Sequence, residues 1–511
     1  MRLRIFCWPA LLLVLELFPL SHPAYPIDNK SVLRICDLGN DAHVRMDPHR
    51  EFDERNDNIL NQLFEHLLEF DIDGNPSPNL ARSWRRLDEL TVQFKLHPNI
   101  FFHNGEALDA YSVKFSLERN LSPELNSPSA HMLDSIDRVE IIDEYTFNIV
   151  TKYPDGILFN RLSQFGYIVP PKYCRTVGPE AFENHPVGTG PFKFAGWVKG
   201  RRLTLVRNEN YWRDGLPKIG KIVFIFADTQ ERVDMLMGGE VDLITSFKPL
   251  DLEKIRKNGF KTIKEPSFTI MAINFNLLKQ GPFQDRRVRQ ALNYAVNVDE
   301  LIENVRQGNG IRRATLGMPG EFGYNPYIKP YSYDFEKAKE LLSQAGYPEG
   351  FTASMMIDDI DGGKESVLGE VLKRQLKKLN IDLKIEGGNG ALRVVNPKYD
   401  SSLPKFDLDI FARSCPDPLS HIIFNEGMVW YASNSPWSLM NHTGFDDVYH
   451  RIIRTVNLKQ QTKLCHQLEN MIREEAFSIF TYQEIKLYAM RKNVEYNPYI
   501  TGMIYLKEAT M

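Results

Sequence analysis

The chain has 511 residues, of which 43% are hydrophobic and 25% are charged, and its formal net charge is −4. This composition is typical of a globular protein, and the length exceeds one ordinary hydrophobic core, so two or three structural units are expected. The weakly negative charge, with no block of basic and aromatic residues, argues against nucleic acid as a partner.

The N-terminus predicts an export signal. Arg2 and Arg4 form a basic start, residues 5–15 are apolar, and small or helix-breaking residues follow. The apolar run is shorter than the roughly 18 residues of a spanning helix, so residues 1–24 are predicted to be a cleaved signal peptide. An uncleaved membrane anchor is the alternative. Cys7 lies too early for a lipidation cysteine, so we expect a soluble exported protein and not a lipoprotein.

Strands and helices are predicted to alternate through the first half of the chain. Strands are assigned where apolar residues alternate or run together, and helices where they recur every three or four residues. In chain order the predicted elements are a strand over 32–36, a helix over 56–70, a strand over 91–96, a helix from the cap Asp109 to Glu118, a hairpin over 137–150, strands over 192–197, 202–206 and 221–226, a helix opened by an Asp228–Glu231 capping box and closed by Gly238-Gly239, and a strand over 241–244. The last three form a βαβ unit, so part of the sheet is predicted to be parallel.

The second half follows the same pattern, which makes the predicted fold class α/β. Helical spacing and alternation predict helices over 288–296, from Asn297 onward, from the cap Asp334 to Ala345, over 367–379 and over 464–472, and strands over 381–385 and 406–412.

The most informative stretch is residues 186–215, which read PVGTGPFKFAGWVKGRRLTLVRNENYWRDG. Gly188 and Gly190 lie between two prolines, which indicates a stiff turn and close backbone approach. After the two predicted strands comes Asn-x-x-Tyr-Trp-x-x-Gly, formed by Asn208, Tyr211, Trp212 and Gly215. An ordinary Gly/Pro hairpin would explain the turn but not the whole ordered string.

This stretch resembles the signature of the family 5 extracellular solute-binding proteins, the large peptide- and nickel-type receptors of ABC importers. Further motifs of that family occur in the same order along most of the chain. They include Asp47-Pro48, Leu63-Phe64-Glu65, Pro78-x-Leu80-Ala81-x-Ser83-Trp84, Gly239-Glu240-x-Asp242, Asn274-x-Asn276, Asp285-x-Arg287-Val288-Arg289, Ala345-Gly346-Tyr347 and Asp417-Pro418.

The resemblance implies an α/β, bilobal periplasmic-binding-protein fold (class II, type C) with an extra domain, mixed sheets and a two-strand hinge. Domain I would comprise residues 27–60, 173–268 and 485–511, domain II would be an insertion over 61–172, and domain III would cover 269–484. Domains I and III would close on the ligand like jaws. The implied function is that of a monomeric periplasmic receptor. It would deliver an oligopeptide-like solute to the permease and ATPase subunits of an inner-membrane ABC importer.

The ligand is expected at residues 411–418, a predicted loop after a strand. In peptide-binding members an aspartate four residues before Pro418 pairs with the α-amino group of the peptide, but here Ser414 occupies that position without a formal charge. Asp417 would supply a carboxylate from a shifted position or only cap a turn. Arg413 would hold an anionic group, such as a peptide C-terminus, through two parallel hydrogen bonds, or form a salt bridge within its own domain.

Two further groups are candidates for contact with the ligand. Asn276 lies near the implied hinge, where it would face the ligand or serve a structural role. Trp430 and Trp437, together with Tyr431, would form an aromatic wall or part of a core. Tyr211 and Trp212 of the signature are expected to pack within the fold.

No motif indicates catalysis, a metal or a cofactor. HExxH, GxSxG, a Walker A sequence and a complete GxGxxG are all lacking. Because Ser414 stands in place of the aspartate, the same receptor with a non-peptide ligand (a nickel chelate, haem, a modified peptide, an opine or a sugar phosphate) is the main alternative, and a secreted hydrolase is a weaker one. Cys36, Cys174, Cys415 and Cys465 allow three full disulfide pairings, among which the sequence does not choose.

Overall fold

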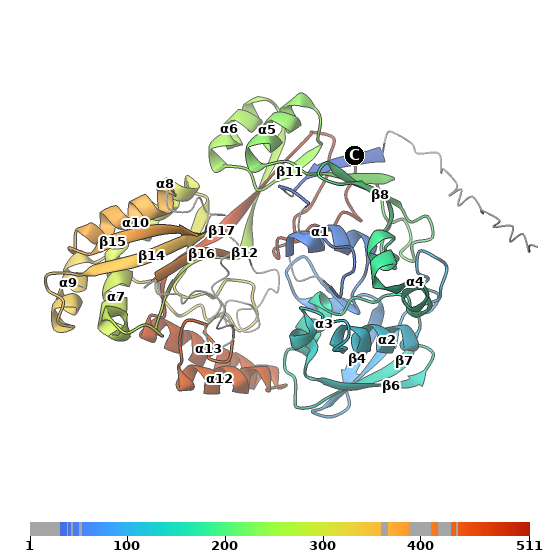
Figure 1. Cartoon of the computed structure of the whole chain (residues 1–511), viewed down its shortest axis with the longest axis horizontal. Coiled ribbons are helices and arrows are strands. Elements are labelled where there is room, and N and C mark those ends of the chain that lie inside the picture. Colours follow the sequence, from blue (N-terminus) through green and yellow to red (C-terminus); the bar gives the residue numbers. More distant parts are fainter. Residues whose placement is uncertain are drawn as a thin grey trace, which may run out of the picture.

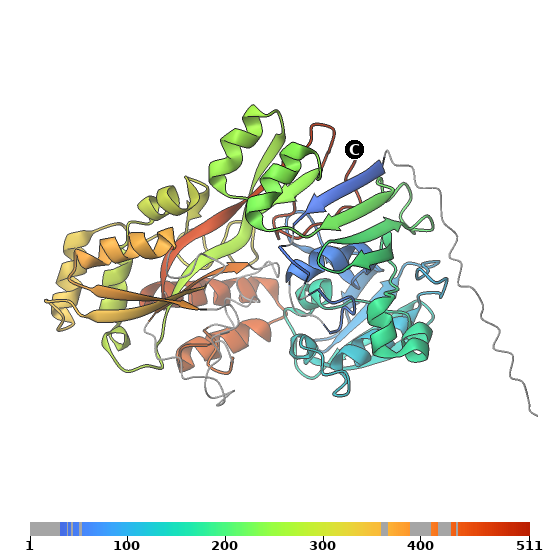
Figure 2. The ribbon, with the colours of Figure 1, turned by 45° about the horizontal axis from the view of Figure 1, so that its top comes forward.

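The structure is a computed structural model that describes residues 31–37, 39–41, 44–50, 54–358, 366–388, 410–416, 431–435 and 438–511. The predicted signal peptide lies outside these residues. Figure 1 shows two bodies side by side, and two long strands run between them, β12 (Lys261–Phe275) and β17 (Ser478–Met490). The turned view in Figure 2 shows the same two strands continuing from the body on the left into the upper part of the molecule.

One large mixed sheet extends through both bodies. Its strand order is β15-β14-β16-β12-β17-β11-β1-β10-β9-β8, and β13 pairs with β17. Besides β12 and β17, its strands are β1 (Val32–Cys36), β8 (Phe192–Val198), β9 (Arg202–Arg207), β10 (Lys221–Ile225), β11 (Leu243–Thr245), β13 (Gly310–Arg312), β14 (Thr352–Asp358), β15 (Asp382–Gly388) and β16 (Ile410–Pro416).

The sheet contains two separate parallel sets. In the first, β1 pairs in parallel with both β10 and β11, which confirms the predicted βαβ unit. In the second, β14 pairs in parallel with both β15 and β16. The part of the molecule built around the first set is called the first lobe below, and the part around the second set is called the second lobe.

A smaller antiparallel sheet forms the lower part of the body on the right in Figure 1. Its order is β4-β5-β7-β6, and a two-stranded sheet of β2 and β3 lies beside it in the sequence. We call residues 61–172, which contain both sheets, the inserted segment. The strands are β2 (Leu68–Phe70), β3 (Pro76–Pro78), β4 (Ala81–Arg86), β5 (Thr91–Leu96), β6 (Ile136–Asp143) and β7 (Thr146–Thr151).

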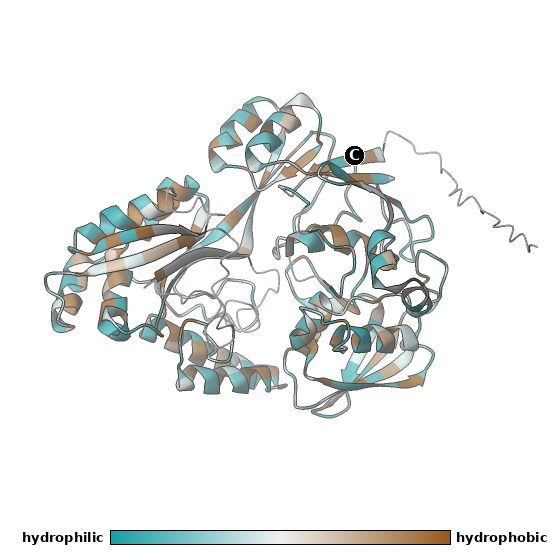
Figure 3. Ribbon diagram, viewed as in Figure 1, coloured by the Kyte–Doolittle hydropathy of each residue, from teal (hydrophilic) through white to brown (hydrophobic). Residues whose placement is uncertain are grey.

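The helices cover these sheets with their apolar faces inward. Figure 3 shows hydrophilic residues on the outward faces of the helices and hydrophobic residues along the strands. Asp109, Asp285 and Asp334 accept backbone N–H groups at helix starts, as good N-caps do. The helices are α1 (Glu54–Leu63), α2 (Ala110–Leu121), α3 (Leu158–Gln164), α4 (Pro171–Asn184), α5 (Thr229–Gly238), α6 (Leu252–Lys257), α7 (Arg286–Ala295), α8 (Val298–Arg306), α9 (Phe335–Gln344), α10 (Val367–Lys377), α12 (Thr443–Ile453) and α13 (Leu458–Glu475).

The buried side chains fall into clusters that follow this division. One cluster takes its buried members from residues 67–168, within the inserted segment. Two clusters belong to the second lobe and draw on residues 268–482. Two others belong to the first lobe and combine residues between 33 and 64, the region between 167 and 255, and residues after 486.

Two predictions about the first lobe are wrong in detail. The helix predicted over 56–70 ends at Leu63, and β2 begins at Leu68. The backbone between them is taken by tertiary partners, because the carbonyl groups of Leu63 and Glu65 accept hydrogen bonds from Gly190 and Ile168. Asp228 is the N-cap of α5, but its side chain makes no capping hydrogen bond, so the predicted capping box is not formed.

The signature glycines make the predicted close approach. A Cβ atom on Gly188 would lie 2.2 Å from the carbonyl oxygen of Leu63, and one on Gly190 would lie 2.5 Å from its carbonyl carbon. The N–H of Gly190 donates to that same Leu63 oxygen over 2.9 Å. The turn therefore packs directly on the C-terminal end of α1, with no room for a side chain.

The last residues of the chain complete the first lobe. The side chain of Asn58 on α1 accepts from the N–H of Ile504 over 2.9 Å, and that of Gln62 accepts from the N–H of Leu506 over 3.1 Å. Gln62 also donates to the carbonyl oxygen of Ile504. The buried face of α1 thus depends on residues more than 440 positions away in the sequence.

Cys36, Cys174 and Cys465 are buried free thiols, so none of the three full pairings is formed. Burial raises the pKa of Cys36 to about 11 and that of Cys174 to about 12. These thiols are therefore held in the unreactive protonated form.

Candidate functional site

The two parallel sets point their carboxyl ends at each other. Across the sheet, Cys36 of β1 pairs with Ile244 of β11, Ile244 pairs with Ala489 of β17, and Ala489 pairs with Thr262 of β12. The last residue of β1 therefore lies level with Thr262. Pro416, the last residue of β16, pairs with Thr269 of β12, and β16 runs antiparallel to β12. The facing ends are thus separated by seven residues of β12, roughly 23 Å at about 3.3 Å per residue.

Between these levels the sheet narrows to the ribbon of β12 and β17. Its register shifts between Pro266 and Ile270. There the buried side chain of Gln483 donates to the carbonyl oxygen of Ser267 over 2.9 Å, and the hydroxyl of Ser267 donates to the carbonyl oxygen of Glu484 over 3.1 Å. At this bulge, side-chain hydrogen bonds take the place of main-chain hydrogen bonds between the two strands. A bulge of this kind is where a two-stranded connection bends most readily.

Facing carboxyl ends are the usual place for a ligand in α/β proteins. Ligands bind outside the carboxyl ends of parallel strands, since the loops that follow the strands meet there. In this chain, β14, β15 and β16 are followed by residues 359–365, 389–409 and 417–430, which lie outside the described residues. The described strands place the carboxyl ends of both parallel sets toward the middle of the β12–β17 ribbon, one set from each lobe.

Arg413 and Ser414 lie on β16, where their backbones pair with Ala272 and Met271 of β12. The prediction of a strand over 406–412 followed by a loop is wrong about where the strand ends, because β16 continues to Pro416, while residues 406–409, 417 and 418 lie outside the described residues. Main-chain pairing with β14 ends at Ala412, and pairing with β12 continues to Pro416 and holds Arg413 and Ser414 in the sheet. Three other predicted ligand residues, Asp417, Trp430 and Trp437, lie outside the described residues.

Asn276 is buried directly after the end of β12. Its side-chain oxygen accepts from the N–H of Leu278 over 3.1 Å, which fixes the turn that leaves the strand. Two residues earlier, the side-chain oxygen of Asn274 accepts from the hydroxyl of Ser478 on β17 over 2.6 Å. Both asparagines therefore form hydrogen bonds that hold the C-terminal end of β12 in place. A role of Asn276 toward a ligand would come in addition to this one.

Tyr431 belongs to a core cluster of the second lobe. It is 2% exposed, its ring lies 5.8 Å from that of Phe445 edge to face, and its hydroxyl bonds to Ser478. For Tyr431, the core interpretation of the predicted aromatic group is therefore correct.

A residue that the sequence analysis did not select, Asp37, directly follows β1. One carboxylate oxygen accepts from the side chain of Asn58 over 2.7 Å, and the other accepts from the hydroxyl of Thr245. Both oxygens are engaged by α1 and β11, so Asp37 ties the rim of the first lobe together. Its position directly after a predicted strand was the sequence signal that could have identified it.

Tyr211 and Trp212 pack away from these strand ends, as predicted. The hydroxyl of Tyr211 and the indole N–H of Trp212 donate to the carboxylate of Glu65 over 2.8 and 2.9 Å. Burial is the main cause that raises the pKa of Glu65, against Arg213 and its hydrogen-bond donors. The signature thus joins the first lobe to the inserted segment through one buried carboxylate.

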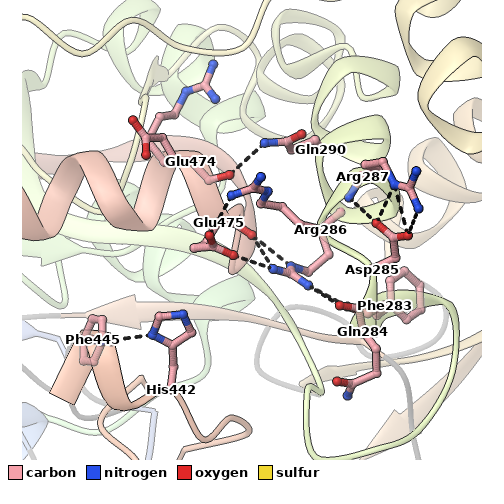
Figure 4. Close-up of polar contacts among 12 residues, drawn as sticks. Phe283, Gln284, Asp285, Arg286, Arg287, Gln290, His442, Phe445, Glu474 and Glu475 are labelled. Atoms are coloured by element: carbon pink, nitrogen blue, oxygen red, sulfur yellow. Dashed lines mark hydrogen bonds and ion pairs between the residues drawn. The ribbon is translucent and has the colours of Figure 1, made fainter. Parts of the chain in front are cut away.

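The Asp285-x-Arg287-Val288-Arg289 motif is structural as well (Figure 4). Arg289 is 4% exposed and donates to the carbonyl oxygens of Glu475 over 2.7 Å and of Phe283 over 2.9 Å. Asp285 caps α7 through the N–H of Arg287. The motif therefore fixes the start of α7 to the end of α13 within the second lobe.

In the part of the chain that the structure describes, no group of three or more His, Cys, Asp or Glu side chains is arranged to hold a metal ion. No helix in that part is long and apolar enough to span a bilayer.

Known proteins are similar to this chain in both sequence and fold. The profile of "Bacterial extracellular solute-binding proteins, family 5 Middle" matches residues 75–416. A glutathione-binding protein GsiB of Pectobacterium atrosepticum is 30% identical over 344 residues, 66% of each chain. Heme-binding protein A of Haemophilus influenzae is 27% identical over 448 residues, 81% of this chain and 80% of the relative.

A solved structure matches almost the whole chain. The periplasmic binding protein DppA from Helicobacter pylori, in complex with the peptide STSA, superimposes with a TM-score of 0.78. The superposition covers 94% of this chain and 98% of DppA at 23% identity, and at that identity it is evidence for the fold alone. Together with the profile match over two thirds of the chain, it confirms the resemblance drawn from residues 186–215. The chain belongs to family 5 of the bacterial extracellular solute-binding proteins, which are non-enzymatic receptors of ABC importers.

Proposed function

We propose that this protein is the periplasmic receptor of an ABC importer and captures a peptide-like solute in the gap between its lobes. The observation that carries the proposal is the pair of parallel strand sets whose carboxyl ends face each other across the β12–β17 ribbon. Contact with both lobes would favour a closed form, which then docks on the permease. Residues 1–24 would direct export and be removed.

The proposed domains follow the buried clusters. Domain I comprises residues 27–60, 173–268 and 485–511, domain II comprises 61–172, and domain III comprises 269–484. The separate core within residues 67–168 supports an inserted domain. The register shift at Pro266–Ile270 supports a hinge close to the boundary at 268.

We propose a short peptide as ligand, with its carboxylate bound by Arg413 and its amino end near Asp417; Ser414, the next residue of the strand after Arg413, belongs to the opposite face of the sheet. The curated relative at 30% identity is a glutathione-binding protein, and a solved structure with the same fold holds a four-residue peptide. Trp430 and Trp437 would provide apolar contact for varied side chains. The name of the relative from Haemophilus influenzae favours haem as the second candidate.

The ligand is tested by calorimetry with purified protein and three probes: glutathione, a mixture of tri- and tetrapeptides, and haem. Intact peptide or glutathione binding supports the proposal, whereas binding of haem alone would replace it with the second candidate. Hydrolysis of a probe, detected by mass spectrometry, would contradict a receptor function.

Arg413 gives a sharper test. If it holds the carboxylate, Arg413→Ala should weaken binding by about 2–5 kcal/mol. The matched control is Arg287→Ala, because Arg287 is an exposed arginine of the same lobe that pairs with Asp285. Equal affinity of wild type and Arg413→Ala would remove Arg413 from the site.

A further inference from the structure

We propose that the inserted segment carries a latch that holds it against the second lobe and raises ligand affinity by favouring the closed form. The latch consists of residues 153–156, in the loop between β7 and α3, and residues 452–461, where α12 passes into α13. Figures 1 and 2 show α12 extending toward the body that carries α3. The effect on affinity rests on the proposed function, but the latch contact itself does not.

Gly156 makes the central contact through its backbone. Its N–H donates to the carbonyl oxygen of Ile453 over 2.8 Å, and its carbonyl oxygen accepts from the side chain of Gln461 over 3.3 Å. Ile453 is the last residue of α12, and the final carbonyl groups of a helix lack partners within the helix. The inserted segment thus caps a helix of the second lobe.

The contact has no room for a side chain. A Cβ atom on Gly156 would lie 2.2 Å from the carbonyl oxygen of Thr455 and 2.5 Å from the side-chain nitrogen of Gln461. Gly156 is not among the residues with positive φ, so its backbone conformation is open to other amino acids. Glycine is therefore required here by the neighbouring lobe and not by its own loop.

The loop is held in shape by its own segment. Asp155 is fully buried, and its carboxylate accepts from the hydroxyl of Ser135 over 2.5 Å, the N–H of Ile157 over 2.8 Å and the guanidinium of Arg161 over 3.0 Å. None of these partners belongs to the second lobe. The latch loop is consequently preformed, so little ordering entropy is lost when the lobes meet.

Aromatic and basic side chains border the contact from both sides. The guanidinium carbon of Arg454 lies 5.0 Å from the centre of the Tyr153 ring, within the range of a cation–π interaction. Burial raises the pKa of Tyr449 on α12, and Arg161 of the inserted segment acts in the opposite direction. Tyr449 therefore sits close enough to the inserted segment to sense its charge.

The latch and the ribbon restrain the lobes in different ways. The ribbon joins first and second lobes covalently, whereas the latch joins the inserted segment to the second lobe by contacts that can open. A receptor with such a contact has a larger fraction of closed molecules before ligand arrives, and its apparent affinity rises in proportion to that fraction.

The test compares wild type, Gly156→Ala and the control Gly238→Ala, all as ligand-free full-length mature protein. A Cβ on Gly238 meets only a side-chain oxygen at 3.7 Å, an ordinary contact. In Gly156→Ala we expect the closed-to-open ratio to fall at least about tenfold. This should appear as a larger radius of gyration by small-angle scattering and faster hydrogen exchange in a peptide spanning 153–158, at an unchanged melting temperature.

Identical scattering and identical exchange in wild type and Gly156→Ala would overturn the proposal. If Gly156→Ala lowers the melting temperature, Gln461→Met replaces it, because that change removes the amide while keeping a similar volume. Unchanged scattering and exchange in Gln461→Met would then be decisive. Failure of every ligand probe, with the scattering difference still present, would contradict the proposed ligand and leave the latch intact.

Discussion

Gly188 and Gly156 present the same local geometry at two different junctions. At each, a Cβ atom would lie 2.2 Å from a carbonyl oxygen of another part of the molecule. Gly188 packs on α1, where the inserted segment meets the first lobe, and Gly156 packs on the end of α12, where it meets the second lobe. The difference between the two glycines lies in what surrounds them.

Around Gly188, several hydrogen bonds and a buried ion pair hold the junction together. His103 accepts from the N–H of Gly188 over 3.2 Å, and Glu65 receives Tyr211 and Trp212 nearby. Arg119 of the inserted segment forms a two-bond ion pair with the fully buried Asp47 over 2.6 and 2.9 Å. Around Gly156, by contrast, the described residues supply one backbone hydrogen bond to Ile453, one hydrogen bond from the side chain of Gln461 and one cation–π contact across the junction. We therefore expect the first junction to stay formed as part of the fold and the second to open.

The largest expected effect is a loss of folding stability at low pH, caused by histidines at the first junction. Burial lowers the pKa of three histidines at the first junction, to about 4 for His49 and to about 3 for both His66 and His103, which accepts from Gly188. Below the ordinary pKa of 6.5 the unfolded chain binds protons that the folded protein does not. These groups should cost no stability above pH 6.5, and the free energy of unfolding should fall by about 4 kcal/mol per pH unit as the pH drops from 6.5 toward 4, since each of the three histidines contributes about 1.4.

Urea unfolding at pH 7.0, 6.0 and 5.0 measures this loss, and His49→Gln is the informative variant. His49 is held in its neutral form because its Nδ1 accepts from Arg119 while its Nε2 donates to the carbonyl oxygen of Tyr167 over 3.0 Å. A glutamine cannot titrate, so the variant should lose less stability per pH unit than wild type. An identical pH slope would show that His49 is not the group responsible.

Gly188→Ala should have the next largest effect. The added methyl group has to displace the backbone of Leu63 in a buried junction, so we expect a loss of about 2–4 kcal/mol in the free energy of unfolding. The measurement is urea unfolding beside Gly156→Ala, which should lose little stability. Equal losses in the two variants would remove the distinction between a folded and an opening junction.

Arg454→Ala should have the smallest effect. It removes the cation–π contact with Tyr153 at an exposed rim, for which about 0.5–1 kcal/mol is typical. The closed-to-open ratio from scattering should therefore fall by a factor of about two to five, less than for Gly156→Ala. A change as large as that of Gly156→Ala would mean that the rim, and not the backbone of Gly156, holds the latch.

Much of the fold followed from local patterns in the chain. The βαβ unit, the hairpin, the caps at Asp109 and Asp334, and the close approach at Gly188 and Gly190 were predicted and are confirmed. The helix predicted over 56–70 was too long because apolar spacing continues past Leu63, while the backbone bonds to distant residues. Tertiary pairing of that kind leaves no mark on hydrophobic periodicity.

The site was less accessible to sequence reasoning. Arg413 and Ser414 were placed in a loop, but the strand continues through both, and only pairing with β12 extends to its end. Gly156 gave no signal either, because an Asp-Gly pair between apolar segments predicts an ordinary turn. The residue that needs Gly156 to be small lies 299 positions later, at Thr455, and only the folded chain brings the two together.

The dependence of α1 on Ile504 and Leu506 also bears on how the protein is made. The first lobe contains β1 near one terminus and these residues near the other, so it cannot finish folding until synthesis ends. Closing contacts across such a distance is slow. A nascent chain would therefore remain incompletely folded until its synthesis ends, which suits the proposed export. A product that ends before residue 500 would lack the partners of α1 and would be open to proteases.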